Sequence, residues 1–465
     1  MNQYLIKSIY IEKLFGLYTY NLDEEKLNNS AVILYGDNGV GKSTLLRLAF
    51  HMLSPSNQNG HRTALSSIKF DLLKIELTSG HTLTAKHESF NTENASLTME
   101  ISHKGNIIAR WVRSPGQNEV RRLVIDDEVV YVREGGPYEN IIIENKRHQN
   151  KDPLRKVTSQ RLYIETLKSI TPITFILDAD RRLDGDTISD PDDEVELRRA
   201  VKMGTPKRIQ DLVLRSREIA LSQAMSAATK WIARKAVQGT NIGTDNVHST
   251  YVRILKQLGS STNQGSTLIV DADIDSLKNN LISIGKETFE LAKYELTSFL
   301  DMTEFQYVLS TGSSSQKALS AELLKPYIES LDGRLAGVRS IYKILDKFIS
   351  TINELLTDKE IQFKLSQGFL IVNKFGDELT PAQLSSGEQQ LLLLFCYVLV
   401  ARDTPSIFMI DEPEISLNIK WQRIIINSLL DITNEANIQF IFASHSLEII
   451  SQHRKRVAKL ENQNG

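Results

Sequence analysis

The glycine-rich turn GDNGVGKST at residues 36–44 constrains the fold of this chain more than any other feature. It follows the short apolar run AVILY, which is typical of a buried strand, and it precedes a helical pattern over 45–53. Its spacing matches G-x-x-x-x-G-K-[ST], in which backbone N–H groups and the positive end of a helix surround a phosphate. A chance match is the alternative, and the flanking strand and helix argue against it. The sequence therefore predicts a phosphate-binding loop in an α/β fold.

Two side chains of this loop have separate expected contacts. Lys42 should lie on the β- and γ-phosphates of a nucleotide, and the Ser43 hydroxyl should lie on Mg²⁺. The loop residues that we expect to bind the nucleotide are Asn38, Gly39, Val40, Gly41, Lys42, Ser43 and Thr44.

Two later apolar runs also end in polar side chains. SIFMI leads into Asp411 and Glu412, and FIFA leads to His445. Because open parallel sheets bind ligands at the carboxyl ends of their strands, these side chains are candidates for catalysis. We expect Asp411 to hold Mg²⁺ through water, Glu412 to orient and polarise an attacking water, and His445 to contact the γ-phosphate or that water. Alone, each could be an exposed turn or a packing histidine, but their order after the phosphate loop favours catalysis.

The stretch LSSGEQQLLLLF at residues 384–395 joins a small polar turn to an apolar helix. Ser385, Ser386 and Gly387 could form an anion site at the helix N-terminus, or they could only cap a core helix, and the local sequence leaves both open. The apolar run Leu391–Val400 is shorter than the roughly 20 residues that cross a bilayer. With no apolar signal segment at the N-terminus, we expect a cytoplasmic protein without membrane contact.

The chain of 465 residues, with a formal net charge of −2, has the length of two to three domains and no excess of basic residues that would require a nucleic-acid partner. Short alternating runs from 68 to 134 predict an antiparallel β lobe. Helical patterns from 194 to 356 lack a sustained heptad repeat, which favours a compact helical insertion over a coiled-coil arm. We predict an N-terminal half of a nucleotide-binding head at 1–182, a helical insertion at 183–357 and the C-terminal half of the head at 358–465.

Together, GDNGVGKST, LSSGEQQ, IDEPEISLN and ASHS resemble the ABC-type ATPase family, and more closely its soluble branch of SMC, RecF and OLD-like proteins. The resemblance implies an α/β, ABC-type P-loop ATPase head with an antiparallel β lobe and an inserted helical lobe, and ATP and Mg²⁺ as cofactors. It implies Walker A roles for Lys42 and Ser43, with Ser43 and Asp411 binding the metal. It also implies that Glu412 is the catalytic glutamate and His445 the switch histidine.

The signature motif of that family resembles LSSGE and implies binding in trans. Ser385 and Gly387 would then touch the γ-phosphate of ATP held by a second subunit, in a dimer or a higher oligomer built from dimers. The sequence departs from the family at Ser386, where a glycine is usual, and at Glu388, where a glutamine is usual. Ser416 to Asn418 resemble the D-loop.

The Q-loop glutamine of the family has no clear counterpart. DADRR, residues 178–182, occupies its place along the chain. Arg181 or Arg182 could sense phosphate there, and a surface salt bridge is an equal alternative.

The OLD-like branch includes ATPase subunits of anti-phage systems such as PARIS and Septu. The resemblance thus predicts a Mg²⁺-dependent ATPase that acts as a sensor or regulatory scaffold in antiviral defence. We expect its effector, such as a nuclease, to be separately encoded, because little chain follows ASHS.

Two other functions stay open. A DNA repair or recombination ATPase of RecF or SMC type would need a DNA-binding face, for which 146–148, 155–156, 198–235 and 453–456 supply candidate basic residues. A transporter ATPase subunit is disfavoured by the large insertion and the missing Q-loop.

Overall fold

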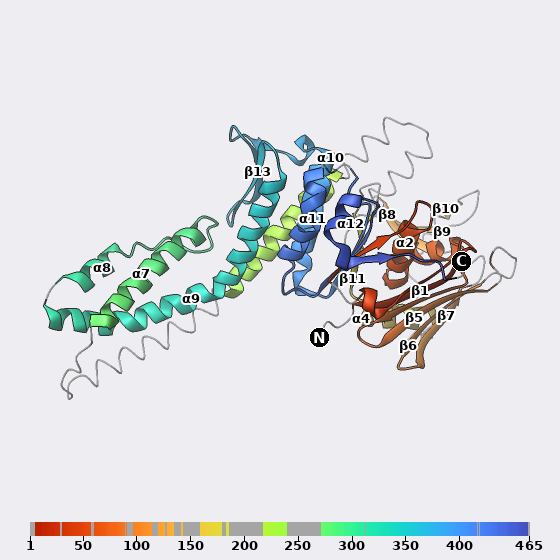
Figure 1. The fold of residues 1–465 in the computed structure, drawn as a ribbon, viewed down its shortest axis with the longest axis horizontal. Coiled ribbons are helices and arrows are strands. Elements are labelled where there is room, and N and C mark those ends of the chain that lie inside the picture. Colours follow the sequence, from red (N-terminus) through yellow and green to blue (C-terminus); the bar gives the residue numbers. More distant parts are fainter. Residues whose placement is uncertain are drawn as a thin grey trace. The chain divides into compact units, whose positions relative to one another are not determined.

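In the computed structural model, whose elements are labelled in Figure 1, the chain forms two units. Unit 1 comprises Met1–Leu221 and Ser385–Gly465, and unit 2 comprises Ser222–Leu384. The residues that the structure describes are 5–27, 30–56, 60–88, 90, 96–113, 120–125, 128–133, 141–142, 159–178, 183–185, 217–239, 271–311, 313–415, 417 and 419–463.

The centre of unit 1 is a six-stranded sheet in the order β12-β11-β16-β17-β3-β18. All its neighbouring strands are parallel except β12, which pairs antiparallel with β11. β16 and β17 are buried along their whole length, which explains why their sequences are mainly apolar. The strand bounds are β3 Ala31–Tyr35, β11 Ile173–Leu177, β12 Leu183–Gly185, β16 Ser406–Asp411, β17 Ile438–Ala443 and β18 Val457–Lys459.

Helices connect the strands of this parallel sheet, and the first of them follows β3 directly through the phosphate loop. These helices are α2 Lys42–Leu53, α10 Ser386–Val400, α11 Ile419–Ile432 and α12 Leu447–Gln452. The predicted α/β nucleotide-binding fold is confirmed, with strands from both ends of the sequence lying side by side.

The second sheet of unit 1 is antiparallel, in the order β2-β1-β4-β5-β6-β7. A separate three-stranded antiparallel sheet has the order β10-β9-β8. These strands confirm the predicted β lobe, and β1 and β2 extend it to the N-terminal residues. The bounds are β1 Ile6–Leu14, β2 Tyr18–Leu22, β4 Leu72–Leu77, β5 His81–Glu88, β6 Ser96–His103, β7 Asn106–Arg113, β8 Val120–Ile125, β9 Glu128–Arg133 and β10 Ile141–Ile142, with helices α1 Glu24–Leu27, α3 His61–Ser67 and α4 Ser159–Ile170.

One buried side chain ties the two large sheets of unit 1 together. Gln439 on β17 accepts a hydrogen bond from the Ile6 N–H at 3.0 Å and donates to the Ile6 carbonyl at 3.1 Å. It also donates to the Leu27 carbonyl at 3.0 Å. A buried amide that satisfies this many backbone groups holds β1 of one sheet against β17 of the other.

Unit 2 is helical, with a small hairpin at its end. It contains most of the helix at 217–239, whose first residues up to Leu221 belong to unit 1. Its other elements are α7 Asp271–Ala292, α8 Thr303–Ser310, α9 Ser314–Leu355, β13 Lys359–Lys364, β14 Gly368–Asn373 and β15 Glu378–Leu379, and a short 3-10 turn at Pro381–Gln383. α7, α8 and α9 lie side by side (Figure 1). Three hydrogen-bonded pairs join α7 and the residues just after it to α9. They are Glu287 with Arg339, Glu290 with Tyr342 and Tyr294 with Asp346, and each pair is 52 residues apart. Because the separation stays constant along the helices, α7 and α9 run parallel.

The expectation of a compact helical lobe is corrected. α9 alone has 42 residues, which at 1.5 Å per residue is about 63 Å. Its partners change along its length from α7 and α8 to the hairpin strand β13. A single heptad repeat requires one continuous partner, and this change explains why the sequence shows none.

The boundary at the C-terminal side of the insertion also differs from the expected one. Residues 358–384 group with unit 2 rather than with unit 1. The Asn353 side chain on α9 accepts from the Ile361 N–H at 2.7 Å and donates to the Ile361 carbonyl at 3.1 Å. Phe348 of α9 packs on Phe369 of β14 at a ring-centroid distance of 5.3 Å. The hairpin therefore shares the core of α9.

Candidate functional site

The phosphate loop has the backbone conformation that its glycines predict. Gly41 precedes α2 with a φ of +93°, and Gly39 has a φ of +83°. A Cβ atom at Gly41 would lie 2.7 Å from Cδ2 of Leu14, so both conformation and space require glycine. The hydroxyl of the buried Tyr20 donates to the Val40 carbonyl at 2.8 Å and so holds the loop backbone.

Lys42 extends under this loop. Its Nζ donates to the carbonyl oxygens of Gly36 at 2.7 Å and Asp37 at 2.9 Å. The residue is buried, and burial lowers the pKa of its ammonium group, while the charges of Glu412 and Asp411 oppose that shift. The Lys42 ammonium group and the N-terminus of the 12-residue helix α2 therefore both make the electrostatic potential at this loop more positive.

Ser43 and Asp411 meet although they come from opposite ends of the chain. The Ser43 hydroxyl donates to Oδ1 of Asp411 at 2.9 Å. Burial raises the pKa of the Asp411 carboxyl, the hydrogen bond from Ser43 lowers it, and the charge of Glu412 raises it. A hydroxyl and a carboxylate oxygen are hard ligands that fit Mg²⁺.

The described residues contain no group of three or more histidine, cysteine or acidic side chains that could hold a metal ion by themselves. Mg²⁺ commonly binds through one or two protein oxygens together with substrate phosphates and water. The Ser43–Asp411 pair is consistent with that kind of site.

Glu412 and His445 also come together. His445 Nε2 lies 2.6 Å from Oε1 of Glu412. Glu412 has a φ of +48°, which is unusual for a residue other than glycine, and its N–H donates to the Ala443 carbonyl at 2.8 Å. Such a conformation costs on the order of 1–3 kcal/mol and persists where the surroundings impose it, often at functional sites.

Arg47 and Asp178 are neighbours of this site that the sequence did not single out as a pair. Arg47 Nε donates to Oδ1 of Asp178 at 3.0 Å. Leu177 lies opposite Ile410 in the parallel pairing of β11 and β16, so Asp178 follows at the same edge as Asp411. The spacing of Ser43 and Arg47, four residues apart on a helix, was the available signal. Asp178 thus occupies the edge where the Q-loop was expected, and Arg181 and Arg182 lie outside the described residues.

The Ser385 turn is the N-terminal cap of α10. Ser385 Oγ accepts from the Glu388 N–H at 3.3 Å, and Glu388 Oε2 accepts from the Ser385 N–H at 2.7 Å. This capping box satisfies two N–H groups, while Ser385 itself stays exposed. The leucines that follow are buried core residues, and none of the helices searched in the described part of the chain is long and apolar enough to cross a membrane.

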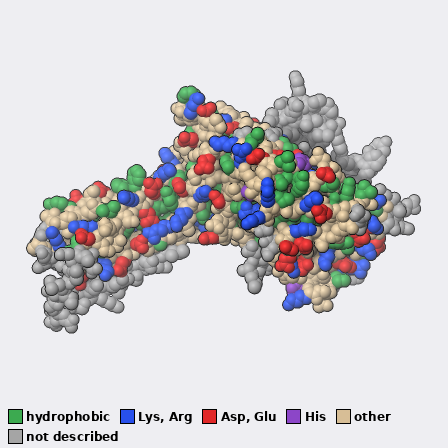
Figure 2. Space-filling view, in the orientation of Figure 1, with side chains coloured by type: hydrophobic (Ala, Val, Ile, Leu, Met, Phe, Trp, Pro, Cys, Tyr) green, Lys and Arg blue, Asp and Glu red, His purple; other side chains and the backbone are tan. Residues whose placement is uncertain are grey.

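Several other predicted segments can be placed only in part. Ser416 and Asn418 of the expected D-loop, the basic residues at 146–148 and 155–156, and residues 198–216 lie outside the described residues. At 453–456, Arg454 and Lys455 are exposed whereas His453 is buried. Acidic and basic side chains are interspersed over the face drawn in Figure 2.

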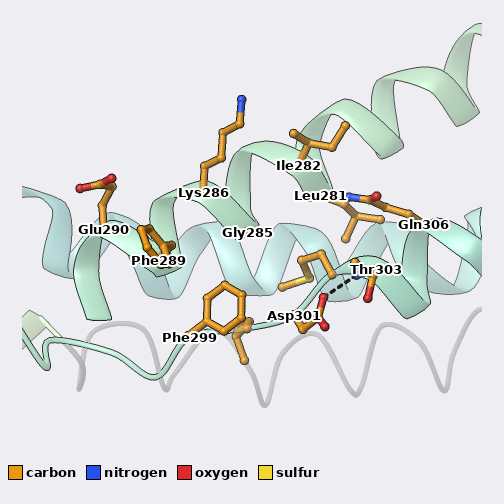
Figure 3. Close-up of a pocket in the computed structure, with 12 residues that line it drawn as sticks. Leu281, Ile282, Gly285, Lys286, Phe289, Glu290, Phe299, Asp301, Thr303 and Gln306 are labelled. Carbon is orange, nitrogen blue, oxygen red and sulfur yellow. Dashed lines mark hydrogen bonds between the residues drawn. The ribbon is translucent and has the colours of Figure 1, made fainter. Parts of the chain in front are cut away.

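A pocket of about 600 Å³ lies in unit 2, and no phosphate-loop residue lines it (Figure 3). α7 and the segment Phe299–Gln306 line it, and Phe289 and Phe299 present their rings at its mouth. Its lining is mainly apolar, and it lacks the glycine-rich backbone of a phosphate site.

Comparisons with known proteins match parts of this arrangement. The family model described as "AAA domain, putative AbiEii toxin, Type IV TA system" matches residues 252–451, which include Asp411 and His445. The molybdenum import ATP-binding protein ModC of Escherichia coli K12 and that of Shigella flexneri are each 38% identical over 82 residues, 18% of this chain. The match spans only 22% of the length of those curated relatives.

Among solved structures, the chain is similar to a Pyrococcus furiosus Smc head domain bound to the C-terminal domain of ScpA. The two share 11% identity, with 98% of this chain and 95% of that chain covered and a TM-score of 0.34. A Pyrococcus yayanosii Smc head shares 13% identity, with 98% and 96% covered and a TM-score of 0.33. The family-model match and the geometry of the phosphate loop support a P-loop ATPase with an ABC-like core.

Proposed function

We propose that this protein is a Mg²⁺-dependent ATPase whose heads pair around ATP. Its role would be that of a sensor or regulatory scaffold in anti-phage defence, together with a separately encoded effector such as a nuclease. The observation that carries the ATPase proposal is the meeting of Ser43 with Asp411, beside Glu412 and His445, at the carboxyl ends of parallel strands.

The phosphate loop would bind the triphosphate. Its backbone N–H groups and the N-terminus of α2 would face the phosphates, and Lys42 would add a positive charge. Lys42 would exchange its two carbonyl partners in the loop for phosphate oxygens, because an ammonium donates to any acceptor within reach. Ser43 and Asp411 would hold Mg²⁺, which when bound neutralises charge on the phosphate oxygens.

Glu412 would be the general base for the attacking water. Its carboxylate stands at the strand end with one oxygen held by His445 Nε2 at 2.6 Å, so the other oxygen is oriented to accept a proton from water. His445 would keep the carboxylate in place and stabilise its charge. General-base catalysis of this kind contributes roughly 10²–10⁴-fold to a rate.

The exposure of Ser385 supports pairing of two heads, with Ser386 half-buried and Gly387 buried behind it. Ser385 caps a 15-residue helix, and the N-terminus of such a helix can bind an anion. Ser386 and Gly387 form the start of its first turn. A γ-phosphate presented by a second subunit would fit that position. The words "putative AbiEii toxin, Type IV TA system" in the matched family description support a role in a toxin–antitoxin or defence system over one in DNA repair.

The experiment that tests this function compares two variants with the wild type. Lys42→Ala should weaken ATP binding about tenfold to a hundredfold, because a charged hydrogen-bond partner of the phosphates is lost. Glu412→Gln should bind ATP normally, lower hydrolysis by roughly 10²–10⁴-fold and accumulate an ATP-bound assembly, measured by light scattering after size exclusion. Lys74→Ala, at an exposed lysine of β4, is the matched control.

Two results would contradict the proposal. Normal ATP binding by Lys42→Ala would remove the phosphate-loop assignment, and wild-type hydrolysis by Glu412→Gln would remove the role of Glu412. A pull-down with the ATP-trapped Glu412→Gln protein identifies the effector. Recovery of DNA in place of a protein effector would favour the repair function.

A further inference from the structure

The carboxylate of Glu414 accepts several hydrogen bonds from residues 444–446, which follow β17 and are called the histidine loop below. Glu414 Oε1 accepts from the N–H groups of His445 at 2.9 Å and Ser446 at 3.0 Å. The Ser444 hydroxyl lies 2.9 Å from each Glu414 oxygen. An ionised carboxylate is an acceptor-only group with two oxygens, which is the chemistry that several converging donors require.

A second contact holds the same two segments on their other side. The Glu412 N–H donates to the Ala443 carbonyl at 2.8 Å, one residue before Ser444. The segments that follow β16 and β17 are thus held together by two sets of hydrogen bonds, one from Glu412 to Ala443 and one from residues 444–446 to Glu414. The side chains of Glu412 and His445, 2.6 Å apart, belong to these same two segments.

The network continues to the turn after Glu414. The Ser446 hydroxyl donates to Oε1 of Gln422 at 3.0 Å, and Nε2 of Gln422 donates to the Leu417 carbonyl at 3.1 Å. Gln422 belongs to α11, and Ser446 caps α12 by accepting from the Ile449 N–H. A displacement of the Leu417 turn would therefore reach the histidine loop through one side chain.

We infer that Glu414 is a positioning residue, which holds the backbone of residues 444–446 and thereby keeps His445 against Glu412. The inference rests on the proposed ATPase function for its effect on catalysis, since Glu412 and His445 are the groups that it positions. Glu414 itself contacts neither phosphate nor metal in this assignment. Its action is exerted through the backbone of residues 444–446.

The test uses the full chain with two variants and one control. Glu414→Ala removes every acceptor at this position, whereas Glu414→Gln keeps one oxygen for the two backbone N–H groups and an amide that can donate to the Ser444 hydroxyl. Glu448→Ala, on the neighbouring helix, removes a carboxylate that pairs with Arg423 at 2.7 Å and leaves the histidine loop intact. Hydrogen exchange, ATP affinity and kcat are measured for all three.

In Glu414→Ala the amides of His445 and Ser446 should exchange about tenfold faster or more. Its kcat should fall about tenfold to a hundredfold with unchanged ATP affinity, as expected when only alignment of the catalytic groups is lost. Glu414→Gln should stay within about threefold of the wild type, because its oxygen retains both N–H bonds. Glu448→Ala should resemble the wild type in every measurement.

Unchanged exchange of these two amides in Glu414→Ala would overturn the inference. A second result would also overturn the inference. If Glu414→Ala and Glu414→Gln lose ATP affinity and kcat to the same extent, the substitutions damage the fold in general rather than the alignment of the catalytic groups. If the wild type hydrolyses no ATP, the proposed function fails, and the exchange comparison still decides whether Glu414 holds the loop.

Discussion

Gly41 and Gly39 differ in one respect that mutation can measure. Both have a positive φ in the phosphate loop, +93° and +83°. A Cβ atom on Gly41 would lie 2.7 Å from Cδ2 of Leu14 and 3.1 Å from Cε2 of Phe15, whereas no heavy atom lies within 4 Å of a Cβ atom on Gly39. The left-handed conformation should therefore affect both alanine variants, and steric overlap only one.

The expected losses of stability follow from these two effects. A left-handed backbone costs an L-residue about 1–2 kcal/mol, which is the cost expected for Gly39→Ala. Gly41→Ala should lose about 1–3 kcal/mol more, because extra atoms in a packed region displace their neighbours. Leu14 is fully buried and has no solvent-facing position to move into.

Urea unfolding without nucleotide, followed by tryptophan fluorescence, measures the difference. Trp111 and Trp421 lie in unit 1 and Trp231 lies in unit 2, so the comparison is made in a Trp231→Phe background, in which only unit 1 contributes. The midpoint of Gly41→Ala should lie clearly below that of Gly39→Ala at an unchanged m-value. Equal free energies of unfolding for the two variants would refute the steric argument and leave only the backbone conformation as the reason for glycine at position 41.

Two further predictions concern the pairing of heads and the packing of the helical unit. Ser385→Phe should leave ATP affinity nearly intact but prevent ATP-dependent pairing and hydrolysis; loss of ATP affinity in a binding titration would show that the turn serves its own subunit. Gly337→Ala should destabilise unit 2 strongly, because its Cβ atom would lie 2.2 Å from the Gly239 carbonyl oxygen. Gly285→Ala, where the nearest atom is Met302 Cγ at 3.5 Å, should stabilise by about 0.5–1 kcal/mol, and equal melting shifts would contradict this.

The parallel sheet and the phosphate loop could be predicted because their signals are local. β16 and β17 are buried on both faces, so their sequences are mainly apolar; β16 ends in Asp411, and His445 lies two residues after the end of β17. The loop pattern is equally local, because Gly41 and Lys42 have conformational or chemical roles within a few residues of each other.

The parts that were missed depend on partners far along the chain. Glu414 looked like one more acidic residue after Asp411, and only the contact with His445, 31 residues later, gives it a role. The hairpin at 359–373 was assigned to the head because α/β character follows it, yet Asn353 and Phe348 bind it to α9. Long-range contacts of this kind leave no periodicity in the sequence.

The insertion of unit 2 between the two halves of unit 1 adds little to the loss of chain entropy when the Ser43–Asp411 contact forms. Ser43 and Asp411 are 368 residues apart, and their hydrogen bond closes a loop that contains the whole helical unit. Loop-closure entropy grows only with the logarithm of length, so each doubling of the loop costs roughly 0.6 kcal/mol. A ligand that contacts both the phosphate loop and the strand ends would bind only the closed arrangement, and its binding free energy would add to the stability of unit 1. Bound nucleotide should therefore raise the melting temperature of unit 1, and a Lys42→Ala protein should lose most of that increase.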